Sequence, residues 1–389
     1  MANNNNSSSS SSKEEQPKSN TNPNTMRAWQ YSRAGKSLAS AMTLNPNARR
    51  PPTPLPADRL LVRVAYMSPN PADHKLPEVG QLVSVLATRS FTATPGMDYA
   101  GIIEEVGSGV GSSTSTSTST SKATTTTTTT TGGSSPSYKP GDRVFGHVGP
   151  TAFGTLGEYI QPYAAGCVAL PASVSPADAA TLGTAAQTAY QALVPYVAAG
   201  RGDEVFVNGG SGGVGTFAIQ IAARALGCVV TASCSARNAE LCASLGASTV
   251  LDYTSTDVSD ALRARGRVFR LVLDAVGSSP ADLYKAADDY LLPEGHFVQV
   301  GAPVGVSSMR SMASRAFLPS ILGGGKRAWK FVLVADQHEH LAQLAQWMEE
   351  GKIRAVIDGD IIPFEEAPKA FEMLKTGRTR GNLVVKVSE

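Results

Sequence analysis

The pattern of apolar and polar residues changes character partway along the chain. Between residues 27 and 164, short apolar runs are separated by Pro and Gly; the run 59–66, for example, lies between Pro56 and Pro69. Short runs bounded in this way predict β-strands. From about Ser175 onward, apolar runs alternate with glycine turns and with stretches of helical spacing. This alternation predicts a parallel sheet covered by helices on both faces.

The second part of the chain contains the clearest elements. Four apolar runs predict the strands of the parallel sheet, at 204–207, 228–231, 271–273 and 297–300. Farther on, residues 341–348 have the spacing of a core helix, and the chain closes with a predicted strand at 383–387. The expected fold class is therefore α/β, with a β-rich domain that brackets a doubly wound one.

Two segments are too polar to form a core. Residues 1–25 consist largely of Asn, Ser and Pro. They cannot bury enough apolar area to offset the entropy lost on ordering, so we predict a disordered tail. Residues 108–137 are almost entirely Ser, Thr and Gly and interrupt two strand-like flanks. We interpret them as a surface insertion, whose closure cost grows only slowly with length. A regulatory loop modified on Ser or Thr is the alternative.

Composition and charge narrow the class of protein. The 389 residues carry 34 Lys and Arg against 32 Asp and Glu, without a basic block, so nucleic acid is not an expected partner. No apolar run approaches the roughly 18 residues that cross a bilayer, which argues against membrane insertion. The four irregularly spaced cysteines are typical of a reducing compartment. We expect a cytoplasmic protein. The alternative is a mitochondrial one, against which Glu14, Glu15 and the lack of Arg before Arg27 argue.

The strongest chemical signal directly follows the strand 204–207. Gly210, Gly212 and Gly215 form a G-x-G-x-x-G pattern, and apolar residues then recur at helical spacing from Val214 onward. In a strand, turn and helix of this kind, small residues let the backbone approach a pyrophosphate, and the first helical amides donate hydrogen bonds to it. The predicted dinucleotide-binding turn comprises Gly210, Ser211, Gly212, Gly213, Val214 and Gly215.

The next strand end bears on the choice of nicotinamide cofactor. NAD-binding proteins usually place an acidic residue about twenty positions after the turn, yet no Asp or Glu occurs between Val205 and Ala239. Ser235, Arg237 and Asn238 instead offer a hydroxyl, a guanidinium and an amide, which match a 2′-phosphate. The sequence therefore predicts NADPH, although Arg237 taken alone also fits an ordinary solvated charge.

The nicotinamide end of the cofactor is expected farther along the sheet. Ligands of open α/β sheets lie at the carboxyl ends of the strands. We therefore predict contacts from Ala275 and Gly277 after one strand and from Gly301 and Ala302 after the next. For Arg380, near the C-terminus, two roles remain open: a contact with the cofactor phosphate, or the capping of a strand.

A series of motifs in fixed order gives the chain a family resemblance. They are N-P-A-D at 70–73, P-G-M-D-Y-A-G at 95–101, K-P-G-D-R-V at 139–144, G-E-Y at 157–159, T-A-Y-Q-A-L at 188–193, the glycine turn, D-A-V-G at 274–277 and G-R-T-R-G at 377–381. The chain resembles the medium-chain dehydrogenase/reductase superfamily, and within it the zinc-free quinone oxidoreductases of the zeta-crystallin and reticulon-interacting type, with their enoyl-reductase relatives.

This resemblance implies an architecture and a cofactor contact. It implies a GroES-like catalytic domain at 26–165, a Rossmann NADP-binding domain at 166–306, and a return to the catalytic domain at 307–389, with substrate in the cleft between the domains. Tyr253 matches a position that contacts the 2′-phosphate in relatives, whereas Asn238 stands where some of them have Lys. Relatives also suggest a homodimer.

The same resemblance bears on a metal site. Asn70 stands where zinc-containing members have their first Cys ligand, and Met97 stands where they have His. Neither residue is a good zinc ligand, and the cysteine pairs of a structural zinc lobe are missing from the sequence. His74 and His147 lack Cys partners, so we interpret them as surface or hydrogen-bonded side chains. We predict no metal.

Hydride transfer without a metal requires another way to stabilise charge on the acceptor oxygen. Quinones and α,β-unsaturated carbonyl compounds delocalise that charge and demand less of the protein. Tyr66, Asn70 and Lys75 lie on a strand end and loop that resemble the cleft wall of the family and can donate hydrogen bonds. Tyr66 is the first candidate to polarise the acceptor or donate a proton; the alternatives are a Tyr that anchors the loop and a proton from water. Asp73 is expected to hold the loop by accepting backbone amides.

These observations predict an NADPH-dependent oxidoreductase that transfers hydride to a quinone or an α,β-unsaturated carbonyl compound without metal. Two alternatives remain. One is an enoyl-thioester reductase, acting in trans with a polyketide synthase. The other is a weakly catalytic, cofactor-binding interaction protein.

Overall fold

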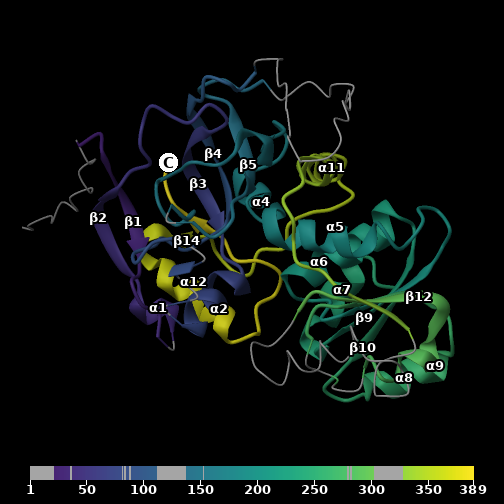
Figure 1. The fold of residues 1–389 in the computed structure, drawn as a ribbon. Helices are drawn as coiled ribbons and strands as arrows, with labels where there is room; N and C mark the ends of the chain where they lie inside the picture. Colours follow the sequence, from purple (N-terminus) through teal and green to yellow (C-terminus); the bar gives the residue numbers. More distant parts are fainter. Residues whose placement is uncertain are drawn as a thin grey trace, which may run out of the picture.

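The computed structural model describes residues 22–111, 137–301 and 327–389, with short gaps at 36, 81, 83–84, 87–88, 152, 278–279 and 281–282. Within these ranges the chain forms two domains, each built on its own sheet (Figure 1). Most of the predicted tail 1–25 and insertion 108–137 lies outside the described residues, as does Ala302. None of the described helices is long and apolar enough to cross a membrane.

The catalytic domain is built on a seven-stranded sheet. The order along this sheet is β14-β15-β3-β4-β5-β7, and β6 pairs with β3. Its strands are β3 (Leu60–Ser68), β4 (Asp98–Val106), β5 (Arg143–His147), β6 (Tyr159–Ile160), β7 (Cys167–Ala169), β14 (Ile362–Pro363) and β15 (Val385–Lys386). A separate antiparallel pair consists of β1 (Thr25–Gln30) and β2 (Thr43–Arg49). The helices α1 (Leu38–Ala41), α2 (Pro71–Val79) and α12 (Ala367–Lys375) contact one another beside these strands (Figure 1).

The Rossmann domain is built on a six-stranded sheet whose neighbouring strands are all parallel. Its strand order is β10-β9-β8-β11-β12-β13. The strands are β8 (Glu204–Asn208), β9 (Val229–Cys234), β10 (Thr249–Asp252), β11 (Phe269–Asp274), β12 (Leu291–Gln299) and β13 (Ala328–Phe331). The helices are α5 (Gln187–Leu193), α6 (Gly213–Gln220), α7 (Ala239–Leu245), α8 (Val258–Arg265), α9 (Ala287–Tyr290) and α11 (His338–Glu349).

The strand β8 shows why this sheet is covered on both faces. Val205 and Val207 belong to an apolar cluster that includes residues of α5 and α6. Phe206, which points to the opposite face, belongs to a cluster with residues of α8 and α9. A strand that is apolar on both faces, as β8 is at Val205, Phe206 and Val207, needs such double cover. The predicted α/β class, a β-rich domain that brackets a doubly wound one, is confirmed.

The two domains share one continuous apolar core. The cluster around α5 and α6 also contains Ala100 and Phe145 from the catalytic sheet. Between the sheets runs the short helix α4 (Pro176–Ala179), followed by a π-helical turn η2 (Leu182–Ala186) that leads directly into α5. Figure 1 shows these segments in the middle of the molecule. The apolar contact holds the phosphate-binding side of the Rossmann domain against the catalytic domain.

Strand pairing gives domain limits that differ from the predicted ones. β7 pairs with β5 in the catalytic sheet, although its residues lie after the predicted limit at 165. β13 pairs with β12 in the Rossmann sheet, although it lies beyond 306. The predicted C-terminal strand 383–387 is also shorter, since only β15 has strand geometry. Short edge strands carry too few residues for their pattern to indicate which sheet they join.

Candidate active site

The glycine turn between β8 and α6 is tied to the neighbouring strand β9. The amides of Gly209 and Gly210 donate to the hydroxyl and the carbonyl of Ser233, at 3.1 and 2.8 Å. Gly209 has a φ of +83°, a backbone conformation that favours glycine. A Cβ atom at Gly215 would lie 2.1 Å from the carbonyl oxygen of Gly209. The tight approach of helix to strand therefore requires glycine at that position.

The start of α6 presents hydrogen-bond donors. Gly212 is the N-cap and carries no side chain that could occupy the first amides. Among the described residues, no acceptor lies within bonding geometry of the amides of Val214 and Gly215. The amide of Gly213 lies beside the carbonyl of Gly381, through the parallel bridge between Gly212 and Gly381. These amides lie at the positive end of the helix. The turn therefore offers hydrogen-bond donors at the positive end of a helix, and its role in binding a pyrophosphate stays a prediction.

The four residues predicted to select NADPH come from two adjacent strand ends. Asn238 is buried and donates from Nδ2 to the hydroxyl of Ser211 at 3.0 Å, while Ser235 and the exposed Arg237 lie on the same turn after β9. Tyr253 follows β10, where its amide donates to Cys234 at 3.1 Å and its ring is 57% exposed. The fold thus gathers these side chains beside the glycine turn.

An acidic residue that lies farther along the chain also reaches this region. Asp252 is the last residue of β10, and its carboxylate accepts hydrogen bonds from the amide of Ala236 at 3.1 Å and from the side chain of Thr254. Hydrogen bonds from Thr254 lower the pKa of Asp252 below its usual range. The carboxylate of Asp252 therefore accepts hydrogen bonds from the turns that follow β9 and β10.

The catalytic domain contributes a segment to the glycine turn. The amide of Gly381 donates to the carbonyl of Ser211 at 2.8 Å, and Arg237 donates from Nη2 to the carbonyl of Arg378 at 3.2 Å. Arg380, which directly precedes Gly381, is exposed, and its amide donates to the carboxylate of Asp358. The structure thus places Arg380 beside the predicted phosphate site, where its guanidinium is solvent-accessible.

Buried polar residues support the nicotinamide end. Asn208, Asp274 and Gln299 are the last residues of β8, β11 and β12. Asp274 accepts hydrogen bonds from Asn208 Nδ2 at 2.9 Å and from the amide of Gly277 at 2.9 Å. Gln299 donates to the carbonyl of Gly301 at 2.9 Å. Sequence reasoning missed these three polar residues, although each ends an apolar strand, which is a recognisable signal.

The same contacts bring the predicted nicotinamide residues together. A Cβ atom at Gly277 would lie 2.0 Å from the carbonyl oxygen of Gly301, and one at Gly301 would lie 2.4 Å from the carbonyl oxygen of Ala275. Gly277 also has a φ of +74°. The two loops therefore touch through their backbones, and only glycine allows this approach.

The three candidate catalytic residues lie on β3, at the N-cap of α2 and on α2. Tyr66, on β3, is half-buried and packs beside the core that both domains share. Asn70 is buried, and its Nδ2 donates to Ser68 at 3.1 Å and to Asp98 at 2.8 Å, so both amide hydrogens already have acceptors. Lys75 lies on α2, half-buried. Their roles in catalysis stay predictions.

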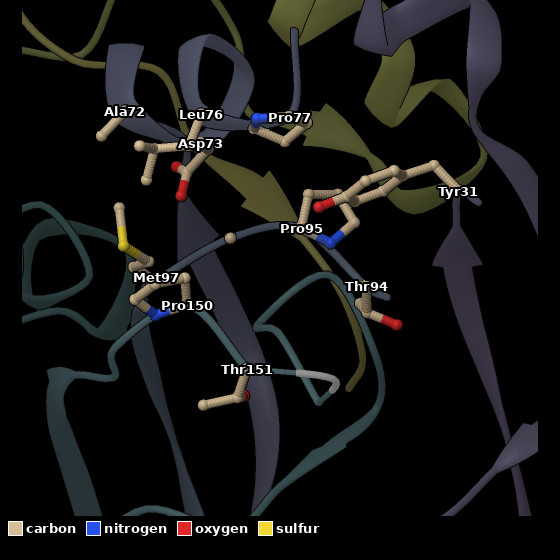
Figure 2. Close-up of a pocket in the computed structure, with 11 residues that line it drawn as sticks. Tyr31, Ala72, Asp73, Leu76, Pro77, Thr94, Pro95, Met97, Pro150 and Thr151 are labelled. Atoms are coloured by element: carbon tan, nitrogen blue, oxygen red, sulfur yellow. The ribbon is translucent and has the colours of Figure 1, made fainter. Parts of the chain in front are cut away.

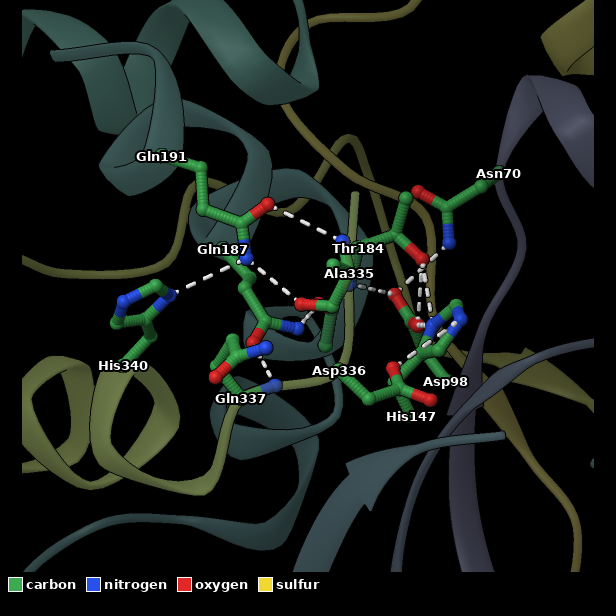
Figure 3. Close-up of polar contacts among 11 residues, drawn as sticks. Asn70, Asp98, His147, Thr184, Gln187, Gln191, Ala335, Asp336, Gln337 and His340 are labelled. Carbon is green, nitrogen blue, oxygen red and sulfur yellow. Dashed lines mark hydrogen bonds and ion pairs between the residues drawn. The ribbon is translucent and has the colours of Figure 1, made fainter. Parts of the chain in front are cut away.

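A buried polar network joins the catalytic domain to the inter-domain turn η2 (Figure 3). One carboxylate oxygen of Asp98 accepts from His147 Nδ1 at 2.9 Å and from the hydroxyl of Thr184 at 2.7 Å. The other accepts from Asn70 Nδ2 and from the amide of Thr184, both at 2.8 Å. On its far side, His147 Nε2 lies 3.6 Å from Asp336, which lies between β13 and α11.

The buried network shifts the pKa values of His147 and Asp336. Burial alone would lower the pKa of His147, but the hydrogen bond and the negative charge of Asp98 offset burial and raise that pKa. Burial raises the pKa of Asp336. His147 is therefore a hydrogen-bonded side chain with an acidic partner, as expected. His74 is likewise buried and lies 3.4 Å from Glu78.

Asp73 holds its loop, as expected, and also lines a pocket. One carboxylate oxygen accepts the amide of Asn70 at 2.7 Å, which fixes the start of α2. The residue also lines a pocket of the catalytic domain together with Met97 (Figure 2). Tyr66, Asn70 and Lys75 are not among the described residues that line it. The described residues contain no group of three His, Cys, Asp or Glu side chains arranged to hold a metal.

The fold and the glycine turn define a two-domain oxidoreductase that binds a nicotinamide cofactor. Family profiles support this class: "Alcohol dehydrogenase GroES-like domain" matches residues 56–172, and "Zinc-binding dehydrogenase" matches residues 245–385. The chain belongs to the medium-chain dehydrogenase/reductase superfamily and to its zinc-free, quinone oxidoreductase-like members.

Individual relatives cover nearly the whole chain. It is 39% identical to the trans-enoyl reductase pgmF of Aspergillus terreus, over 95% of this chain and 99% of that one. It is 30% identical to a 2-methylene-furan-3-one reductase of Solanum lycopersicum, over 93% of this chain and 79% of that one. The structure of the quinone oxidoreductase from Coxiella burnetii superposes with a TM-score of 0.74 at 26% identity, over 93% of this chain and 99% of that one.

Proposed function

We propose that this protein is an NADPH-dependent reductase that transfers hydride, without a metal, to a carbon–carbon double bond conjugated to a carbonyl group, or to a quinone. The observation that carries the proposal is that the amides of Val214 and Gly215, at the start of the helix after β8, have no acceptor among the described residues. The loops at Gly277 and Gly301, after β11 and β12, touch through their backbones at the same edge of the sheet. A pyrophosphate on these amides would direct a dinucleotide along the carboxyl edge of the sheet.

The bound nicotinamide would supply the hydride, and the residues of this chain would bind and orient both reactants. Selection of NADPH over NADH rests on Ser235, Arg237 and Asn238, with Tyr253 beside them. Arg237 is exposed and lies one turn from Ser211, where a 2′-phosphate would extend from the adenosine. A guanidinium can form two charge-assisted hydrogen bonds to such a group.

The proposed absence of a metal rests on the chemistry of the residues at the site. The side-chain amide of Asn70 donates to Asp98 and Ser68, so it is held as a structural donor. Met97 offers a thioether, which is a poor ligand for zinc. Acceptors that delocalise negative charge need less stabilisation than an isolated ketone, and this preference supports enones and quinones as substrates.

A second candidate is the reduction of an enoyl thioester presented by a partner protein. The 39% identity to a trans-enoyl reductase over 99% of that protein's length favours it. The relation to a 2-methylene-furan-3-one reductase, whose name describes an enone, favours a free small molecule instead. Both substrates share the conjugated double bond, and they differ in what is attached to the carbonyl carbon.

The test is a titration with NADPH and NADH followed by rates with three acceptors: a small quinone, an enone and a crotonyl thioester. We expect NADPH to bind at least about 10-fold more tightly than NADH, since charge-assisted bonds to the 2′-phosphate are strong. Equal affinity for both cofactors would contradict the assignment of Ser235, Arg237 and Asn238. Turnover of the thioester alone would replace the leading proposal by the second candidate.

A further inference from the structure

A pocket in the catalytic domain is lined mainly by apolar side chains. Its walls come from α2, from the segment before β4 and from the loop after β5, and they include Leu76, Pro95, Met97 and Pro150 (Figure 2). Among the described lining residues, Asp73 carries the one carboxyl group. The pocket adjoins the inter-domain turn, because Met97 directly precedes the start of β4 that is bonded to η2.

Asp73 is buried with half of its carboxyl group unpartnered. The side chain belongs to a residue that is only 6% exposed. Its Oδ2 accepts the amide of Asn70, whereas its buried Oδ1 has no hydrogen-bond partner among the described residues. Figure 2 shows the carboxyl group pointing from α2 toward the segment that holds Pro95 and Met97. The hydroxyl of Thr94, on the same pocket, is also buried without a partner in the described part of the chain.

An unsatisfied buried oxygen is costly, and native structures rarely keep one without a reason. The second oxygen of Asp73 already meets the structural need, since it holds the start of α2. The buried Oδ1 of this pocket-lining residue is therefore not needed for that bond. A ligand with a polar atom at this position would satisfy it.

The surroundings of Asp73 keep a substantial fraction of its carboxyl group protonated near neutral pH. Burial raises the pKa of Asp73 to about 7; the amide of Asn70 opposes this shift, and the negative charge of Asp98 adds to it. Taken element by element, the ionisable groups around it are Tyr31, His74, Lys75, Asp98 and His147. A protonated carboxyl group can donate a hydrogen bond into an otherwise apolar pocket.

We propose that Asp73 binds the carbonyl oxygen of the substrate and protonates it during reduction. This inference rests on the proposed function and names the residue that completes its chemistry. It also defines the substrate class as neutral carbonyl compounds, because a carboxylate in this pocket would face a second acidic group without a cation among the lining residues.

The proposed step balances as follows for an enone. Hydride from the reduced nicotinamide forms a C–H bond at the β-carbon, and the electron pair of the double bond shifts toward the carbonyl oxygen. The O–H bond of Asp73 breaks, and its proton forms the O–H bond of the enol. The enol then becomes the saturated carbonyl compound by proton exchange with water. Asp73 is left as a carboxylate and recovers its proton from water after the product leaves.

The experiment uses the full-length chain with NADPH and the acceptor that wild type reduces fastest. Asp73→Asn keeps an oxygen for the amide of Asn70 but cannot supply a proton. We expect kcat to fall about 100-fold, the usual contribution of a general acid, with an unchanged Kd for NADPH. The wild-type kcat should fall as pH rises through about 7, and the variant should lack this limb. Asp142→Asn, in the turn before β5, is the matched control and should behave as wild type.

A kcat for Asp73→Asn within about 3-fold of wild type, which is far less than a general acid contributes, would overturn the proposal. So would a wild-type kcat that is constant across this pH range. If wild type reduces none of the three acceptors, the proposed function fails, and binding then tests Asp73 separately. Cyclohexenone without cofactor should shift the infrared carbonyl band of the protonated Asp73 acid, a band that Asp73→Asn lacks. An unshifted wild-type band would overturn the role of Asp73, whether or not the variant folds.

Discussion

The backbone amide of Gly381 donates a 2.8 Å hydrogen bond to the carbonyl of Ser211. This bond connects the returning C-terminal segment of the catalytic domain to the glycine turn of the Rossmann domain. Gly381 has a φ of +77°, and a Cβ atom there would lie 2.2 Å from the carbonyl oxygen of Val356. The packing of the glycine turn against the catalytic domain therefore depends on a glycine far from the turn in sequence.

Gly381→Ala should weaken both folding and cofactor binding. The left-handed backbone costs an ordinary residue about 1–2 kcal/mol, and the contact with Val356 would add to this cost because the segment must shift. Gly377→Ala is the matched control, since Gly377 has a φ of +65° but no atom within 4 Å of its added Cβ. Chemical denaturation and NADPH titration measure the two effects. Equal losses of unfolding free energy and of NADPH affinity in the two variants would show that the contact at Gly381 is unimportant.

Val214→Asp should abolish tight cofactor binding without unfolding the domain. A carboxylate in the first turn of α6 favours the helix through its dipole, but it would repel a pyrophosphate on the same amides. We expect the Kd for NADPH to rise by at least about 100-fold, since like charges at contact cost several kcal/mol. Val214→Thr has nearly the same shape without charge and should bind within about 3-fold of wild type. Fluorescence titration measures the Kd for NADPH, and a thermal melt measures whether the domain stays folded. Tight NADPH binding by Val214→Asp would show that the glycine turn does not bind the cofactor.

Arg237→Ala should reduce the preference for NADPH and leave NADH binding nearly unchanged. The lost interaction is a charge-assisted bond worth about 1.5–3 kcal/mol, which corresponds to roughly 10- to 100-fold in Kd. Arg201→Ala, another exposed arginine in the loop before β8, is the control. Parallel titrations with both cofactors measure the ratio. A parallel loss of NADH affinity would indicate a structural role for Arg237 through its bond to Arg378.

Asp98→Asn should destabilise the protein, and more strongly at low pH. Removing one partner of a buried charged pair typically costs about 3–5 kcal/mol. The folded protein raises the pKa of His147. The stability from this bond is therefore complete below the unfolded value near 6.5 and is lost as pH rises through the folded value. The loss of unfolding free energy in Asp98→Asn should accordingly be larger at about pH 5.5 than at about pH 8.5, by the same linkage.

Urea denaturation of wild type and Asp98→Asn at both pH values measures this difference. Thr184→Val tests the neutral part of the same network, because it removes a hydroxyl bond to Asp98 without changing a charge. Its effect should vary little with pH. A pH-independent loss in Asp98→Asn would argue that His147 is uncharged in the folded protein.

The elements nearest to each other in sequence were predictable. The strand, the glycine turn and the helix around Gly210 and Gly215 follow from local spacing, and the structure confirms their order. The parallel sheet also follows from the pattern, because a strand such as β8 that is apolar on both faces requires cover on both sides.

Other features depend on residues that are distant in the chain. The pairing of β7 with β5 and of β13 with β12 could not be predicted, because edge strands of three and four residues carry no distinctive pattern. The sequence indicated a structural role for Asp73, as an acceptor of backbone amides in its loop. Only the folded structure shows that its other oxygen is buried on a pocket formed with Met97.

By itself the sequence determined the strand–glycine turn–helix unit, since this unit rests on the periodicity and identity of residues within about thirty positions, the size of one strand–helix–strand unit. It also determined the family, through motifs that occur in a fixed order along the chain. Tertiary structure alone decided the contact of Gly381 with Ser211, the network around Asp98 and the position of Asp73. These contacts join segments from different parts of the chain. Burial, which the local sequence does not specify, determines the charge and the hydrogen-bonding capacity of such groups.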